Sequence, residues 1–153
     1  MKRVLVAVGG AKGSLACVTA CASLFADRPP PAVLLLTVVQ YGGPAAADGV
    51  INDAELAELR ETLEGTDILE ELKAKAEAGF AHPRKFLEDH GFRDVRGVVR
   101  IGRPADEIVA GAAEHGAEMI VIGNTRSLLD KLLLGNVTQQ VAKAATVPVL
   151  LVR

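Results

Sequence analysis

Two glycines in the last third of the sequence are spaced to hold an anion on backbone N–H groups. Gly123 follows the apolar run 119–122, and Gly135 precedes Asn136, Val137 and Thr138 at what we predict to be the start of an amphipathic helix. Unbonded N–H groups and the helix dipole at such a start favour a phosphate. The alternative is an ordinary helix cap, with the Asn136 side chain as acceptor, that meets only water.

Positive side chains near these glycines allow two interpretations. Arg126 lies between them, where its guanidinium either donates to a bound phosphate or fills the phosphate site itself. Lys12 and Lys131 either add positive charge to the same site or are solvated surface cations, which is the interpretation we favour.

The remaining residues offer little catalytic chemistry. His82, His90 and His115 lack the spacing of a zinc site, and the sequence contains no Gly-x-Ser-x-Gly elbow and no Walker loop. Cys17 and Cys21 lie four residues apart on one helical face, and we favour two buried thiols over a disulfide or a metal pair. With no convincing base or nucleophile, we expect a protein that is not an enzyme.

Composition limits the class of protein. A chain of 153 residues is long enough for one domain, which we expect to span 1–153. The net charge of -2 argues against a nucleic-acid partner bound through the overall field. No apolar run reaches the length of a membrane-spanning helix, and the apolar run after Met1–Arg3 is too short for a signal peptide. We therefore expect a cytoplasmic protein without a membrane partner.

Apolar runs and helical spacing alternate along the chain. Five predicted strands are 3–8, 32–39, 95–101, 119–122 and 148–152, and the predicted helices are 13–26, 54–90 with a break near 65–67, 104–116 and 136–145. Residues 41–53 are predicted to form a loop. This alternation predicts an α/β fold with a parallel sheet between two helical layers. Ligands of such folds bind beyond the carboxyl ends of the strands, where the strand order reverses.

Five segments resemble the universal stress proteins, and together they extend over essentially the whole chain. They are MKRVLVAV at 1–8, IGRPADEI at 101–108, AEMIVIG at 117–123, LLLGNVT at 132–138 and VPVLLVR at 147–153. The resemblance implies a doubly wound five-stranded parallel sheet of order 3-2-1-4-5, with helices on both faces, of the Rossmann-like, adenine nucleotide alpha hydrolase-like type. It also implies ATP or AMP in the crevice between strands 1 and 4.

The resemblance places candidate nucleotide-binding residues at the ends of three strands and at the start of the last helix. They are Ala7, Val8, Gly9, Gly10, Val38, Ile122, Gly123, Arg126, Gly135, Asn136, Val137 and Thr138.

The chain departs from the nucleotide fingerprint of the family, which resembles Gly-x-x-Gly, nine residues, then Gly-Ser or Gly-Thr. Arg126 replaces the second glycine, eight residues separate it from Gly135, and Asn136 replaces the hydroxyl residue. Gly9 stands where many members carry an Asp close to the phosphates and Mg²⁺. We therefore expect ATP or AMP binding to be weak or absent and Mg²⁺ to play no part.

Three functions of different classes remain. We favour a non-enzymatic protein of stress response with a weak adenine-nucleotide or anion pocket. The alternatives are a dimeric interaction protein without a nucleotide ligand and, last, a slow nucleotide hydrolase. The apolar residues 147–152 predict an unprotected edge strand, so we expect a homodimer through the C-terminal strand, 147–153.

Overall fold

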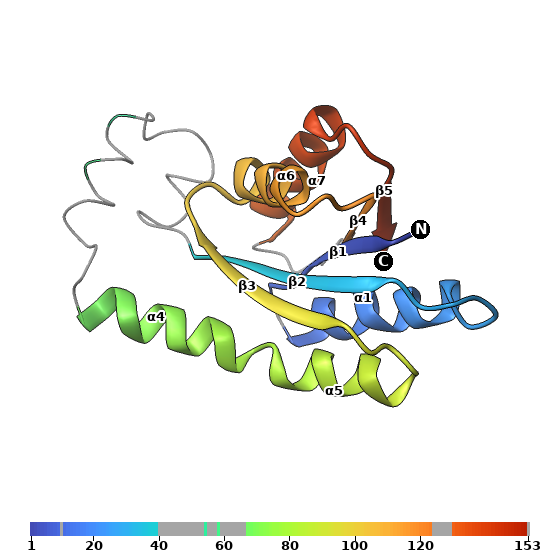
Figure 1. The fold of residues 1–153 in the computed structure, drawn as a ribbon. Coiled ribbons are helices and arrows are strands. Elements are labelled where there is room, and N and C mark those ends of the chain that lie inside the picture. Colours follow the sequence, from blue (N-terminus) through green and yellow to red (C-terminus); the bar gives the residue numbers. More distant parts are fainter. Residues whose placement is uncertain (10, 40–53, 55–57, 59–66, 124–129, 153) are drawn as a thin grey trace.

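The predicted parallel sheet is confirmed by the computed structural model, which describes residues 1–9, 11–39, 54, 58, 67–123 and 130–152. Its strands are β1 (Arg3–Ala7), β2 (Ala32–Val39), β3 (Val95–Ile101), β4 (Met119–Gly123) and β5 (Val149–Val152). They lie in the order β3-β2-β1-β4-β5, and every neighbouring pair is parallel (Figure 1). The order therefore reverses between β1 and β4, as expected.

Helices cover both faces of the sheet. The helices α1 (Ala11–Leu24), α4 (Asp67–Ala78) and α5 (Ala81–Asp89) lie on one face, and α6 (Pro104–Glu114) and α7 (Asp130–Ala144) lie on the other (Figure 1). The predicted loop 41–53 lies outside the described residues. Within the described part of the chain, no helix is both long and apolar enough to span a bilayer.

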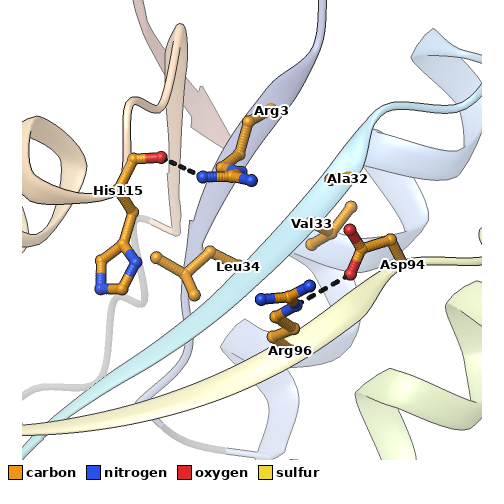
Figure 2. Close-up of a pocket in the computed structure, with 7 residues that line it drawn as sticks. All are labelled: Arg3, Ala32, Val33, Leu34, Asp94, Arg96 and His115. Atoms are coloured by element: carbon orange, nitrogen blue, oxygen red, sulfur yellow. Dashed lines mark hydrogen bonds and ion pairs between the residues drawn. The ribbon is translucent and has the colours of Figure 1, made fainter.

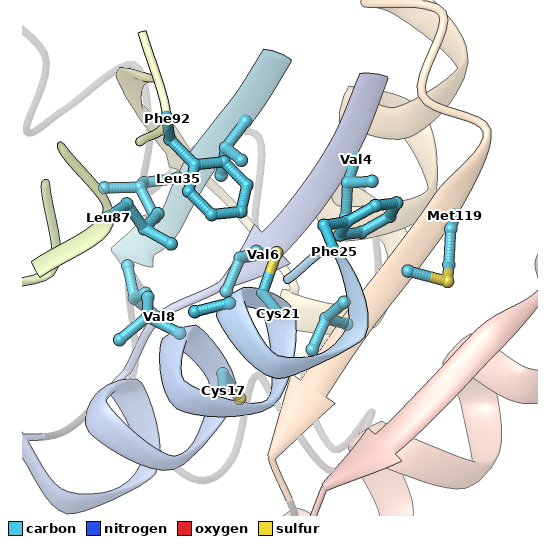
Figure 3. Packing of buried hydrophobic residues seen from close by; sticks show 14 of the residues in the cluster. Val4, Val6, Val8, Cys17, Cys21, Phe25, Leu35, Leu87, Phe92 and Met119 are labelled. Atoms are coloured by element: carbon cyan, nitrogen blue, oxygen red, sulfur yellow. The ribbon is translucent and has the colours of Figure 1, made fainter. Parts of the chain in front are cut away.

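Side chains of β1 alternate between two apolar layers because successive residues of a strand point to opposite faces. Val4 and Val6 belong to the cluster shared with α1 and α5, whereas Leu5 belongs to the cluster shared with α6 and α7. All three are fully buried. Figure 3 shows the first cluster, in which Phe25 and Leu87 pack near the valines of β1.

Both cysteines face this first cluster, so the interpretation as buried thiols is confirmed. Cys17 and Cys21 are 1% and 0% exposed and unpaired (Figure 3). Burial raises the pKa of the Cys17 thiol to about 11. Burial, with a smaller contribution from Cys17, raises that of Cys21 to about 12. Neutral thiols of this kind act as small apolar side chains.

The prediction that a helix runs from 67 to 90 without a break is wrong. The helix α4 ends at Ala78, and α5 begins at Ala81 after Gly79 and Phe80. Pro83 accounts for the break, because proline has no N–H for the carbonyl of residue 79 and its ring would collide with that carbonyl. The break also buries Phe80, which is 2% exposed and packs over Gly97 of β3.

The strand β3 lies at an edge of the sheet, as its arginines predicted, but the two arginines differ. The Arg96 side chain is 74% exposed, whereas Arg100 is 19% exposed and bound to α6. The Arg100 guanidinium donates to Glu107 Oε2 at 2.7 Å and to Glu114 Oε2 at 2.6 Å. These ion pairs connect the edge strand to the helix above it.

Candidate functional site

The carboxyl ends of β1 and β4 meet where the strand order reverses. Val6 is in register with Val121, so Ala7 and Ile122 follow side by side. Ala7, Val38, Ile122 and Val137 all belong to the apolar cluster under α6 and α7. The structure thus brings together four of the predicted site residues from three strands and one helix. They form an apolar wall, a name we keep for these four residues.

The chain leaving β1 is tied to β2 by two hydrogen bonds. The Val8 N–H donates to the Leu36 carbonyl at 2.9 Å, and the Thr37 hydroxyl donates to the Val8 carbonyl at 2.9 Å. Sequence reasoning missed Thr37, although a single hydroxyl residue in an otherwise apolar strand was a signal for such a contact. These bonds fix the backbone immediately before Gly9.

Gly9 is exposed, and packing does not require a glycine there. Among the residues that the structure describes, a Cβ at this position would have no neighbouring atom within 4 Å. A larger side chain, including the Asp that the family resemblance leads one to expect, therefore has room. Packing around Gly9 therefore does not explain why this position lacks a carboxylate.

The prediction that Gly135 and Asn136 open the last helix is wrong. The helix α7 begins at Asp130, so both residues lie inside it, where backbone N–H groups bond to carbonyls four residues earlier. Leu132, Leu133 and Leu134 are good helix formers, and one glycine costs a helix only about 1 kcal/mol relative to alanine. The unbonded N–H groups of this helix accordingly belong to its first residues, from Asp130 onward.

The remaining predicted site residues are placed as follows. Val137 is 7% exposed within the apolar wall, and Thr138 and Gly123 are half-buried. Gly10 and Arg126 lie outside the described residues, so their assignment to the site stays a prediction.

The described site residues are apolar side chains, glycines and one threonine. Ala7, Val8, Gly9, Val38, Ile122, Gly123, Val137 and Thr138 include no carboxylate and no imidazole. Elsewhere in the described ranges, no group of three or more His, Cys, Asp and Glu side chains is placed to hold a metal ion. Ile122 and Val137 are buried, Ala7 and Val38 are half-buried, and Gly9 is exposed.

Sequence comparison identifies a family for this arrangement. A sequence model of the Universal stress protein family matches residues 1–153. A universal stress protein of Methanothermobacter thermautotrophicus is 35% identical over 121 residues, which are 79% of this chain and 75% of that protein.

Solved structures with the same fold include nucleotide complexes. The structure of the hypothetical protein MJ0577 has a TM-score of 0.74 and 25% identity. The match covers 99% of this chain and 94% of the MJ0577 chain. That protein is from Methanocaldococcus jannaschii. An Arabidopsis thaliana universal stress family protein with AMP bound has a TM-score of 0.64 and 17% identity. The match covers 99% of this chain and 91% of that one. A universal stress protein in complex with cAMP has a TM-score of 0.65 and 19% identity, covering 99% and 96%. The sequence match along the whole length, on this sheet order, shows that the chain belongs to the universal stress protein family.

Proposed function

We propose that the chain is a non-enzymatic stress-response protein that binds an adenine nucleotide weakly and without Mg²⁺ between β1 and β4. One observation carries the proposal: an apolar wall lies at the reversal of the strand order, beside Gly9 in place of a carboxylate. Similar folds that hold AMP and cAMP support the choice of ligand.

In this proposal the adenine ring packs on the apolar wall, and the phosphate lies toward Gly9. Ligands of doubly wound sheets bind in this crevice, because loops from adjacent strands diverge there. Mg²⁺ binds through one or two carboxylates together with phosphate oxygens. Gly9 supplies no such ligand, so the nucleotide binds as a free anion.

Catalysis is not part of the proposal because a hydrolase needs a group that accepts or donates a proton beside the reacting phosphate. The described residues of the crevice are apolar, glycine or threonine. Thr37, next to it, already donates its hydroxyl to the Val8 carbonyl. Absence of phosphate release from ATP during long incubation is the expected result.

Calorimetric titration with AMP tests the site. Gly9→Glu places a carboxylate in open space, so we expect the variant to fold and to bind AMP at least ~10-fold more weakly, through charge repulsion. Ser23→Glu is the matched control, because it adds the same charge at an exposed position near the end of α1, toward the amino ends of the strands. Equal AMP affinity in the two variants would rule out this site.

The alternative of an interaction protein without a nucleotide ligand has its own outcome in this experiment. It requires that AMP, ADP and ATP all give no heat of binding to the unmodified protein. Mass spectrometry of small molecules released from freshly purified protein then finds no adenine nucleotide.

We also propose that β5 pairs with β5 of a second copy. The strand β5 lies at an edge of the sheet, and Leu151 is 44% exposed. An apolar edge strand with unpaired backbone groups favours pairing with another chain, and a two-fold axis closes the assembly. Leu151→Lys is expected to give a monomer by light scattering, whereas Leu24→Lys, at an equally exposed position of α1, leaves a dimer. A monomeric unmodified protein at micromolar concentration would contradict the proposal.

A further inference from the structure

A second pocket lies at the opposite end of the sheet, at the amino ends of β1, β2 and β3. It is lined by Arg3, Ala32, Val33, Leu34, Asp94, Arg96 and His115 (Figure 2). None of these residues belongs to the proposed nucleotide site. The sequence separates them widely. Parallel pairing brings together the residues at the starts of the three strands, and His115 joins them from the end of α6.

Two arginines and a histidine surround the Leu34 side chain in this pocket (Figure 2). The Arg3 guanidinium donates through Nη1 to the His115 carbonyl, which follows the end of α6. This bond holds Arg3 at the pocket while leaving its other N–H groups without a hydrogen bond in the described part of the chain.

Arg96 is similarly held but keeps donors for a ligand. Its Nε donates to Asp94 Oδ1 at 3.1 Å. Its two terminal nitrogens make no hydrogen bond within the described ranges. Asp94 therefore orients the guanidinium and offsets part of its charge. Two guanidinium groups against one carboxylate leave the pocket with a net positive charge.

The size of the pocket limits the ligand. Its cavity volume is about 30 Å³, which is room for roughly two water molecules. Drug-sized ligands occupy roughly 300–1,000 Å³, so this pocket can take only a single small group. Guanidinium groups match the planar or tetrahedral arrangement of oxygens in carboxylates and phosphates.

We propose that Arg3 and Arg96 form a second ligand site, which binds a compact oxyanion, the carboxylate or phosphate group of a small metabolite. The site is separate from the nucleotide crevice and stands whether or not that crevice binds a nucleotide. Exposed ion pairing is weak in water, so a dissociation constant in the millimolar range is expected.

Nuclear magnetic resonance titration of the full chain at constant ionic strength tests this site. The probes are inorganic phosphate and succinate, and the readout is the backbone amides around residues 32–34 and 94–96 and the ring signals of His115. Arg96→Gln is expected to weaken binding ~10-fold by removing one charged donor pair. Asp94→Asn keeps the side-chain shape, removes the competing negative charge, and is expected to tighten binding several-fold.

The control separates specific binding from general attraction to cations. Arg28→Gln removes an equally charged, exposed side chain that does not line the pocket, and it should leave the affinity unchanged. A response to phosphate alone identifies a phosphate group as the ligand, and a response to succinate alone identifies a carboxylate. No shift of these signals at ~50 mM of either probe, or equal affinities in Arg96→Gln and Arg28→Gln, would overturn the proposal.

Discussion

The two ends of the sheet differ in chemistry. At the carboxyl end, between β1 and β4, the described residues are apolar side chains and glycines, with Gly9 exposed and uncrowded. At the amino end, Arg3, Asp94, Arg96 and His115 line one pocket, where Arg3 donates to the His115 carbonyl and Arg96 to Asp94. The proposed nucleotide site therefore follows from the strand order, although its described residues carry little charge. The charged pocket arises at the end where fold rules alone predict no ligand.

The largest expected effect is a difference in unfolding free energy between alanine substitutions at Gly97 and at Gly9. Gly97→Ala would drive a Cβ into the Phe80 ring, and overpacking of this kind costs about 1–3 kcal/mol of unfolding free energy. Gly9→Ala meets no atom and should change that free energy by less than about 0.5 kcal/mol. Urea denaturation of both variants is the measurement. Similar losses in the two would show that Gly9 is packed after all.

The hydrogen bond at the amino end predicts the next largest effect. Arg3→Met keeps much of the apolar stem but removes the donor to the His115 carbonyl, so we expect a loss of about 1 kcal/mol in unfolding free energy. Arg28→Met serves as the control, because the Arg28 side chain is exposed and makes no such bond to any residue that the structure describes. A stability of Arg3→Met equal to that of the control would mean that the bond does not hold α6 to β1.

Restoring a carboxylate should change the metal dependence of the carboxyl end. Gly9→Asp has room for its side chain and supplies the kind of ligand that Mg²⁺ takes together with phosphates. We expect ATP binding by this variant to strengthen ~3- to 10-fold on addition of Mg²⁺, by calorimetry. The unmodified protein should show no such gain. A variant that ignores Mg²⁺ would place the phosphates away from Gly9.

The smallest effect concerns the ion pairs of Arg100, which lie outside both ends. The hydrogen bond from Arg100 lowers the pKa of Glu114 from its ordinary value of 4.5. A carboxyl group whose pKa is lowered by folding stabilises the fold above its unfolded pKa. That contribution disappears as the pH falls through the folded pKa. Because Glu114 is exposed, the difference in unfolding free energy between the unmodified protein and Glu114→Gln should be slight at pH 7. It should vanish at a pH well below 4.5. A difference that grows with acid would contradict this account.

Much of the fold could be predicted because buried parallel strands appear in the sequence as short apolar runs. The predicted ranges 32–39 and 95–101 agree with β2 and β3. Helix limits were harder to predict. Pro83 marked the break between α4 and α5, and the three leucines before Gly135 continued a helix that glycine alone was expected to start.

The position of the proposed nucleotide site was predictable because it depends on the strand order. The strand ends that form the apolar wall follow from strand order and apolar runs. The amino-end pocket could not be predicted in this way. Its arginines belong to different strands, and the orientation of Arg3 depends on a carbonyl beyond the end of α6.

The most direct test of the central claim is calorimetric titration of the unmodified protein with AMP and ATP, each with and without Mg²⁺. We predict weak binding, with dissociation constants of roughly micromolar or higher, that is the same with and without Mg²⁺. Tight ATP binding that requires Mg²⁺ would contradict the claim, because the crevice between β1 and β4 would then contain a metal ligand that Gly9 does not supply.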